Sequence, residues 1–266
     1  MADVERNLEV WQAGWDWSTE GDEWSSWWGG TPALWHGALL PRLHAFVPAG
    51  TILEIAPGFG RWTQYLKDLC TDLTIVDLTE RCIEGCKQRF AGATNIEYHV
   101  NDGRSLGMVA DGTVDFCFSF DSLVHAEADV LEAYLAQLAR KLKPDGVGFF
   151  HHSNIGHLRA LTAIARRAPE GHRRRLVNRG VLPDIYAWRA QSMTAALFAE
   201  QCRAAGLACV SQEKINWEFG AYLTDAISIF TPRGSRWEST PRVVRNPLFR
   251  EEAKRMAKLY SIESFA

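Results

Sequence analysis

Short apolar runs alternate with helical patterns along the central part of the chain, from Gly50 to about residue 230. Five apolar runs have the length of buried strands: 51–56, 73–78, 96–100, 114–120 and 147–151. Apolar residues at spacings of three and four between these runs predict helices over 61–70, 80–90 and 128–142, and a turn is predicted at 143–146. Strands separated by helices of this length indicate right-handed βαβ units and a parallel sheet.

The alternation changes after the fifth strand. Residues 155–189 are helical in pattern and too long for an ordinary connection, so we expect an insertion over the carboxyl edge of the sheet. A helix over 194–205 precedes two strands, 208–217 and 224–230, and a sequential pair without an intervening helix is antiparallel. The tail from Thr231 is polar, basic and only partly helical. The pattern thus predicts an α/β fold with a doubly wound, mostly parallel, seven-stranded sheet.

The N-terminal segment is unusually rich in tryptophan. Its seven tryptophans are Trp11, Trp15, Trp17, Trp24, Trp27, Trp28 and Trp35. Two interpretations remain open: a helical extension anchored to the main domain by large aromatic side chains, or a lid over a ligand pocket. We therefore divide the chain into an extension or lid (1–49), a main domain (50–232) with a helical substrate-cap insertion (155–191), and a tail (233–266).

Composition limits the classes of partner. The 266 residues carry a net charge near −3, which does not favour nucleic acid as a partner. No apolar run reaches the roughly 20 residues that a transmembrane helix needs, and the polar, acidic N-terminus does not resemble a signal peptide. Six dispersed cysteines fit free thiols in a reducing compartment better than a disulfide framework. We therefore expect a cytoplasmic protein without a membrane partner.

A glycine-containing loop directly follows the first strand, in the order Glu54-Ile-Ala56-Pro-Gly58-Phe-Gly60. Glycine has no Cβ and tolerates positive φ, so the backbone of this loop can approach a ligand closely. The helix that follows presents free N–H groups towards the same place. The loop is therefore a candidate ligand-binding site.

Further candidate residues follow the next strands. Asp77 ends the second strand, where a carboxylate can accept hydrogen bonds from ribose hydroxyls. Asp102 follows the third strand, where it can accept a hydrogen bond from an adenine amino group. Phe120 to Ser122 follow the fourth strand and are expected to form the floor of the pocket. Ligands of open parallel sheets lie outside the carboxyl ends of the strands, where all these residues are predicted to be.

This order of motifs resembles class I S-adenosylmethionine-dependent methyltransferases over about Gly50 to Pro232. The resemblance implies that the glycine loop contacts the methionine part of the cofactor, that Glu54 orders the loop, and that Asp77 and Asp102 hold ribose and adenine. The expected S-adenosyl-L-methionine site comprises Glu54, Ala56, Gly58, Gly60, Asp77, Leu78, Asp102, Gly103 and Phe120. Ala56 stands where the family often has its first glycine, and its methyl group is tolerable there if φ is negative. Arg61 and Trp62 either touch the cofactor carboxylate or simply pack.

A nicotinamide dinucleotide is the alternative cofactor. Gly58, Gly60 and Thr63 loosely imitate the dinucleotide fingerprint, and Asp77 suits its ribose. The β-branched Thr63 in place of the third glycine would obstruct close helix–strand packing, and neither Glu54 nor Asp102 has a role in that scheme. The methyl donor is favoured.

Candidate catalytic residues follow the fourth and fifth strands. His125 and His152 are the candidate bases, because the pKa of histidine lies near neutrality. Alternation places one of His151 and His152 towards the core, and we expect His152 to face the pocket, with Asn154 as a substrate contact. Asp121, His125 and His152 are a conceivable magnesium or manganese set, but no pair of adjacent carboxylates follows the fifth strand, so no metal is expected.

The resemblance to bacterial sugar and natural-product enzymes implies methyl transfer to a hydroxyl or amine of a small polar molecule. We expect the pocket to be walled by the N-terminal segment and by residues 155–189. Arg173, Arg174 and Arg175 form either a solvated helix face or a contact with an anionic group, and Tyr186, Trp188 and Arg189 are further candidate contacts. A non-catalytic cofactor-binding module is the main alternative function, and the oligomeric state, including a homodimer, stays open.

Overall fold

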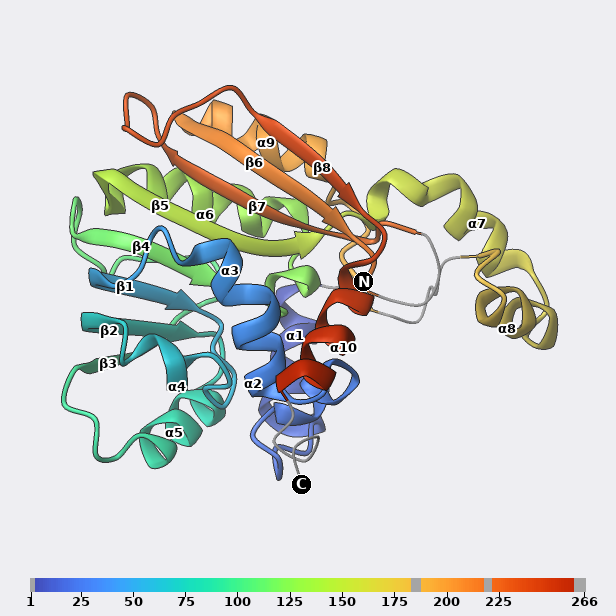
Figure 1. Ribbon diagram of the computed structural model, residues 1–266, viewed down its shortest axis with the longest axis horizontal. Coiled ribbons are helices and arrows are strands. Elements are labelled where there is room, and N and C mark those ends of the chain that lie inside the picture. Colours follow the sequence, from blue (N-terminus) through green and yellow to red (C-terminus); the bar gives the residue numbers. More distant parts are fainter. Residues whose placement is uncertain (1–2, 183–187, 218–221, 261–266) are drawn as a thin grey trace.

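One eight-stranded sheet forms the centre of the computed structural model, which describes residues 3–182, 188–217 and 222–260 (Figure 1). The strands are β1 (Ala49–Ile55), β2 (Cys70–Asp77), β3 (Ile96–Val100), β4 (Val114–Ser119), β5 (Leu142–Ser153), β6 (Leu207–Ile215), β7 (Asp225–Pro232) and β8 (Arg242–Asn246). Their order is β3-β2-β1-β4-β5-β7-β6-β8. Strand β7 is antiparallel to β5 and β6, and the other pairs are parallel. The doubly wound, mostly parallel sheet and its antiparallel closing pair are therefore confirmed.

The strand order reverses between β1 and β4. Ile52 of β1 pairs with Phe116 of β4, while Ile52 also pairs with Leu73 of β2 on the other side. Chains that leave neighbouring strands in opposite directions open a crevice at the carboxyl ends of those strands. The fold thus places a binding site beyond β1, β2 and β4.

Helices cover both faces of the sheet. On one face, α6 (Ala128–Lys141) and α9 (Ala195–Ala204) pack against buried residues such as Leu53 and Phe150. The other face is covered by η2 (Asp22–Trp28), α2 (Thr31–Leu34), η3 (Trp35–Leu39), α3 (Leu40–Leu43), α4 (Thr63–Leu66), α5 (Glu80–Arg89) and α10 (Phe249–Tyr260). Strand β4 shows why both faces need cover, since Phe116 and Phe118 belong to one core and Cys117 to the other.

Threonine side chains cap the starts of α5 and α9. Thr79 caps α5 by accepting the N–H of Cys82 at 3.2 Å, and Thr194 caps α9 by accepting that of Leu197 at 3.0 Å. Each cap satisfies one of the N–H groups that a first helical turn leaves unpaired.

Three predictions about the elements were wrong. Residues 143–146 lie within β5, where the pairing with β4 shifts register between Val114 and Phe116, instead of forming a separate turn. The helix expected over 61–70 is limited to α4, because Cys70 already begins β2. The tail adds β8, an eighth strand beside β6, to the seven that were predicted, while its α10 agrees with the expectation of a partly helical tail. Strand β8 was missed because it is short, basic and largely exposed.

Short helices and turns lie before the first strand and in the connections that follow β4 and β5. The N-terminal segment begins with α1 (Val4–Glu9) and the π-helical turn η1 (Val10–Gly14). The turn η4 (Leu123–His125) follows β4. After β5 come η5 (Ile155–Leu158), α7 (Arg159–Arg167) and α8 (Glu170–Asn178), and α7 and α8 project from the body of the protein (Figure 1). Within the described residues, no helix is long and apolar enough to cross a membrane.

Candidate functional site

A cavity of about 570 Å³ lies at the carboxyl ends of β1, β2 and β4. Its walls include the segments that directly follow these strands, namely Ala56–Phe59, Asp77–Leu78 and Phe120–Leu123. This is the crevice that the reversal of strand order creates. The cavity is therefore the candidate site.

The glycine loop passes along the wall of the cavity. Gly58 has φ of +60° and Gly60 has φ of +83°, so the prediction of positive φ at both is confirmed. A Cβ at Gly60 would lie 2.4 Å from the Phe90 ring, and one at Gly58 would lie 3.1 Å from Trp17. Glycine at 60 thus allows helix α5 to pack close to the loop, and glycine at 58 leaves bare backbone at the cavity.

Ala56 contradicts the expectation of a negative φ. Its φ is +58°, a left-handed conformation that costs a residue with a Cβ about 1–2 kcal/mol. Two backbone bonds hold it: its N–H donates to the Val76 carbonyl at 2.7 Å, and its carbonyl accepts from Ser122 Oγ at 2.7 Å. The positive φ explains why the family often has glycine at this position. The alanine is tolerated here because its hydrogen bonds to Val76 and Ser122 hold the backbone in this conformation.

Asp77 joins the loop to the second strand. Its carboxylate accepts the N–H of Gly58 at 3.2 Å and that of Thr79 at 2.9 Å, and it lines the cavity. Burial raises the pKa of Asp77 to about 6, although these hydrogen bonds oppose the rise. The structure therefore brings Asp77 and Gly58 to one edge of the cavity, as the sequence predicts.

Glu54 lies behind the loop and not on the cavity wall. Its Oε2 accepts from Thr63 Oγ1 at 2.6 Å, and its Oε1 is buried without a hydrogen-bond partner in the described part of the chain. Burial raises its pKa to about 8, so the carboxyl group is protonated at neutral pH. Glu54 links β1 to the start of α4 and so supports the loop from behind.

Glu54→Gln is expected to change the pH dependence of stability. The native pKa of Glu54 lies above its unfolded value of 4.5, so the native state binds more protons between pH 4.5 and about 8 and stability falls as pH rises through that window. Glutamine cannot titrate. The free energy of unfolding of the wild type, relative to Glu54→Gln, should fall by about 1.4 kcal/mol per pH unit between pH 5 and 7.5. Urea unfolding at several pH values measures this, and parallel curves for the two proteins would refute the assignment.

Asp102 does not reach the cavity, which corrects its expected role. Its exposed carboxylate accepts the N–H groups of Arg104 and Ser105 at 2.9 and 2.7 Å and the Ser105 hydroxyl at 2.7 Å. The Ser105 and Arg104 hydrogen bonds lower the pKa of Asp102. The side chain caps its own turn, so Leu78 and Gly103 form this wall instead. A Cβ at Gly103 would lie 3.2 Å from both Leu78 and Val4, so these two side chains pack closely against the Gly103 backbone.

Aromatic side chains line the opposite end of the cavity. Phe120 is buried and packs edge-on against Trp62 at 5.7 Å and against Trp217 at 5.6 Å. The Arg61 guanidinium lies 4.6 Å from the Trp62 ring centre. We take this aromatic end, which includes Phe120 as the expected pocket floor, as the candidate site for the acceptor molecule and call it the acceptor end.

His125 lines the cavity at the end of η4. Its Nδ1 lies 2.5 Å from the Trp188 carbonyl, and its ring contacts Trp188 and Trp11 at 4.9 and 5.6 Å. A carbonyl only accepts hydrogen bonds, so Nδ1 carries the proton and Nε2 keeps the lone pair. Loss of contact with water and the nearby Arg189 cation lower the pKa of His125 to about 4. The imidazole is therefore neutral at physiological pH, and Nε2 is its proton-accepting atom.

His152 does not face the cavity, contrary to the prediction. Its Nε2 lies 2.8 Å from Ser228 Oγ, its ring stacks on Phe198 at 4.2 Å, and burial lowers its pKa to about 4. It belongs to the face covered by α9. Asn154 is structural as well, because its side chain donates to the Leu223 carbonyl and accepts the Ala195 N–H, both at 2.8 Å.

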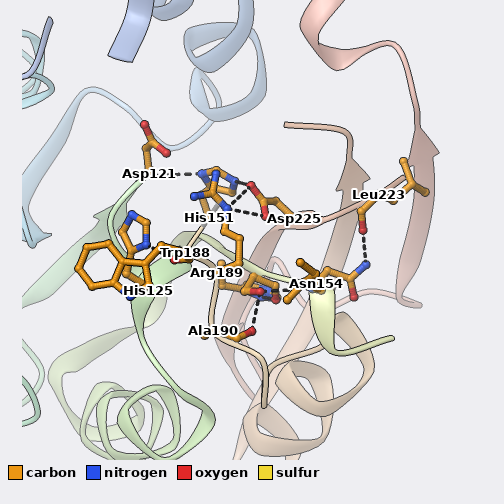
Figure 2. A network of polar contacts seen from close by, with 12 residues as sticks. Asp121, His125, His151, Asn154, Trp188, Arg189, Ala190, Leu223 and Asp225 are labelled. Carbon is orange, nitrogen blue, oxygen red and sulfur yellow. Dashed lines mark hydrogen bonds and ion pairs between the residues drawn. The ribbon is translucent and has the colours of Figure 1, made fainter. Parts of the chain in front are cut away.

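His151 points the other way and joins a polar network at the acceptor end (Figure 2). Its Nδ1 accepts the N–H of Asp121 at 3.1 Å, and its Nε2 lies 3.3 Å from Asp225 Oδ2. Arg189 binds the same aspartate, and Arg61 pairs with Asp121 at 2.8 Å. Alternation along β5 identifies the correct pair of histidines but not which face is the site.

The N-terminal segment covers the cavity. Six of its tryptophans line the cavity wall: Trp11, Trp15, Trp17, Trp24, Trp27 and Trp28. Trp17 stacks on Phe59 of the glycine loop at 4.5 Å and 12°. The Asn7 side chain donates to the His125 carbonyl at 2.8 Å. The lid interpretation and the anchor interpretation are thus both compatible with the same contacts.

The insertion contributes less to the cavity than expected. Trp188 and Arg189 line it, whereas α7 and α8, with Arg173, Arg174 and Arg175, do not. Tyr186 lies outside the described residues. Trp217 and Arg250 are among the lining residues that escaped the sequence reasoning, because they come from distant elements and carry no motif; Asp121 was expected at the pocket floor but not as an ion-pair partner. The described residues contain no group of three potential metal ligands.

Part of the chain is similar to known proteins. Residues 52–146 match the family model of a methyltransferase domain, and no curated protein matches the chain. PH0226 from Pyrococcus horikoshii OT3 is 19% identical with a TM-score of 0.57, covering 86% of this chain and 97% of its own. DhpI in complex with SAM and HEP is 23% identical, with the same coverages and TM-score. The mitomycin 7-O-methyltransferase MmcR is 15% identical over 80% of this chain and 55% of its own, with a TM-score of 0.50. These similarities show a shared class I methyltransferase fold.

Proposed function

We propose that this chain, whose residues 52–146 form a methyltransferase domain, is an S-adenosylmethionine-dependent methyltransferase. Its acceptor is a hydroxyl or amine of a small polar metabolite such as a sugar, an aminoglycoside or a related natural product. The observation that carries the proposal is the cavity in which the bare backbone of Gly58 meets the Asp77 carboxylate.

The residues present fit this cofactor. Gly58 has no Cβ towards the cavity, which suits the amino-acid half of the cofactor, and Asp77 has a carboxylate suited to ribose hydroxyls. Leu78, Gly103 and Val4 line the cavity with apolar groups, a surface suited to a flat base. When bound, S-adenosylmethionine supplies an electrophilic methyl group, so the protein has chiefly to align the acceptor and exclude water.

The N-terminal segment supports water exclusion, and we extend the proposal to residues 1–49 as a lid. Trp17 covers the glycine loop and Val4 covers Gly103, so one segment reaches both halves of the proposed cofactor site. Trp11 contacts His125 at the acceptor end. Large aromatic faces are suited to packing against a sugar ring.

His125 is the proposed base for a hydroxyl acceptor. The Trp188 carbonyl fixes its tautomer, and Nε2 is left to accept the hydroxyl proton. His152 is not part of this mechanism because it lies on the other face of the sheet.

His125→Ala is expected to lower turnover by about tenfold or more while cofactor affinity changes less than about twofold. Because the pKa of His125 is lowered to about 4, the wild-type rate at saturating S-adenosylmethionine should show no histidine inflection near pH 6.5. Initial rates between pH 5 and 8 measure this, with His172→Ala on the projecting helix α8 as the matched control. A fully active His125→Ala protein would remove the proposed base.

The function itself is tested with methyl-labelled S-adenosylmethionine and a panel of sugars, aminoglycosides and small amines, analysed by mass spectrometry. Transfer of the label to a panel member supports methyl transfer, and the fragmentation pattern distinguishes O- from N-methylation. Cofactor binding without transfer to any acceptor would favour a non-catalytic binding module.

A further inference from the structure

Asp121, the second residue after β4, has a left-handed backbone with φ of +64°. This conformation is unfavourable for residues with a Cβ, and aspartate is among those that tolerate it best. Such strain persists only where the surroundings fix the backbone, and it concentrates at functional sites. The groups around Asp121 therefore indicate why it is held.

His151 fixes the backbone of Asp121 (Figure 2). The ring is fully buried between Phe120 and Trp217, at centroid distances of 4.5 and 4.9 Å. Its Nδ1 accepts the Asp121 N–H at 3.1 Å, which requires the proton of a neutral ring to be on Nε2. Nε2 lies 3.3 Å from the buried Asp225 carboxylate, which favours the same tautomer.

Asp225 is held in turn by Arg189. The Arg189 Nε lies 3.0 and 3.1 Å from the two carboxylate oxygens, and Arg189 also lines the cavity. A continuous chain of contacts thus begins at Arg189, at the end of the insertion. It runs through Asp225 of β7 and His151 of β5 to Asp121. Nδ1 of His151 accepts a hydrogen bond and Nε2 faces the Asp225 carboxylate, and His151 is not among the residues that line the cavity, so it is not placed to act on a substrate directly.

The Asp121 side chain, whose backbone this chain of contacts holds, forms a buried ion pair with Arg61. Asp121 Oδ2 lies 2.8 Å from Arg61 Nη2, the two side chains are 8% and 5% exposed, and both line the cavity. Buried ion pairs add little net stability because desolvation offsets their attraction. Side by side, they offer a carboxylate that accepts hydrogen bonds and a guanidinium that donates them. A vicinal diol or an amino alcohol matches this arrangement.

We propose that Asp121 and Arg61 form the subsite that binds the acceptor, through a vicinal diol or amino alcohol group, and that His151 is a positioning residue that holds Asp121 for this contact. The proposal rests on the methyl-transfer function proposed above. It assigns recognition to Asp121 and leaves proton removal to His125.

The test compares His151→Phe, His151→Asn and Asp121→Ala with His152→Phe. His152 is the matched control because it is the neighbouring residue, is equally buried and faces the opposite side of the sheet. The probe is an equimolar mixture of glucose, galactose and glucosamine, assayed with methyl-labelled S-adenosylmethionine. Isothermal titration measures cofactor affinity separately.

We expect His151→Phe and Asp121→Ala to raise the apparent KM for the mixture at least tenfold, with cofactor affinity within twofold of the wild type. Asparagine can accept the Asp121 N–H, so His151→Asn should stay within threefold of the wild-type KM, as should His152→Phe. If His151→Phe fails to fold, the KM of Asp121→Ala tests the proposal instead, because this substitution leaves the buried imidazole ring in place.

Equal KM values for His151→Phe and His152→Phe, or an unchanged KM for Asp121→Ala, would overturn the proposal. A wild type that binds the cofactor but methylates none of the sugars would overturn the acceptor class alone, and one that does not bind it would overturn both proposals.

Discussion

Asp77→Ala is expected to weaken S-adenosylmethionine binding more than tenfold, a loss of over about 1.4 kcal/mol. A buried carboxylate that accepts ribose hydroxyls contributes charge-assisted hydrogen bonds of about 1.5–3 kcal/mol each. The same substitution releases the N–H of Gly58, which Asp77 holds at 3.2 Å. Isothermal titration measures the affinity directly.

The pH dependence of the same affinity provides the control. Burial raises the pKa of Asp77 to about 6, so the wild-type carboxylate becomes protonated as pH falls from 7 to 5. A protonated carboxyl group is a poorer hydrogen-bond acceptor, and wild-type affinity should fall over this range while Asp77→Ala stays nearly constant. Equal affinities of the two proteins at pH 7.5 would discredit the ribose assignment.

Gly60→Ala is expected to destabilise the protein by about 2–5 kcal/mol. Its φ of +83° disfavours any Cβ by about 1–2 kcal/mol, and overpacking against Phe90, whose ring would lie 2.4 Å away, adds about 1–3 kcal/mol. Phe90 follows α5, so relief of the clash would move a helix away from the glycine loop.

Gly92→Ala is the matched control, because a Cβ at Gly92 meets nothing within 4 Å. Its free energy of unfolding should stay within about 0.5 kcal/mol of the wild type. Urea unfolding of both variants measures the difference. A Gly60→Ala protein as stable as Gly92→Ala would show that the close approach of loop and helix is not a constraint.

Much of the fold could be predicted from sequence because buried parallel strands are short, continuously apolar runs. β3 and α5 were predicted almost to the residue from their apolar patterns, and the structure shows a threonine cap and basic residues at the ends of α5. β8 could not be found, because a short, largely exposed edge strand with sequence Arg-Val-Val-Arg-Asn has no apolar run. Its pairing with β6 depends on tertiary contacts.

Site residues could be predicted where the loop backbone determines their position. They could not be predicted where the direction in which a side chain points decides whether it reaches the cavity. Gly58 and Asp77 line the cavity and follow from the loop and from the end of the second strand, whereas Gly60 packs against Phe90. Asp102 was misplaced because its carboxylate is satisfied by its own turn, a local competition that spacing does not reveal. His152 was chosen over His151 because alternation along a strand does not show which face lies towards the site. Trp217 and Arg250 reach the cavity only through the fold.

The central claim is that a sulfonium nucleoside lies between the glycine loop and Asp77, beneath the N-terminal tryptophans. A crystal structure of the protein grown with S-adenosylhomocysteine tests this most directly. We expect its ribose on the Asp77 carboxylate, its amino-acid part along the backbone of Gly58, and its adenine against the wall formed by Leu78 and Gly103. A cavity that stays empty at saturating nucleoside, or that takes up a nicotinamide dinucleotide in preference, would contradict the account.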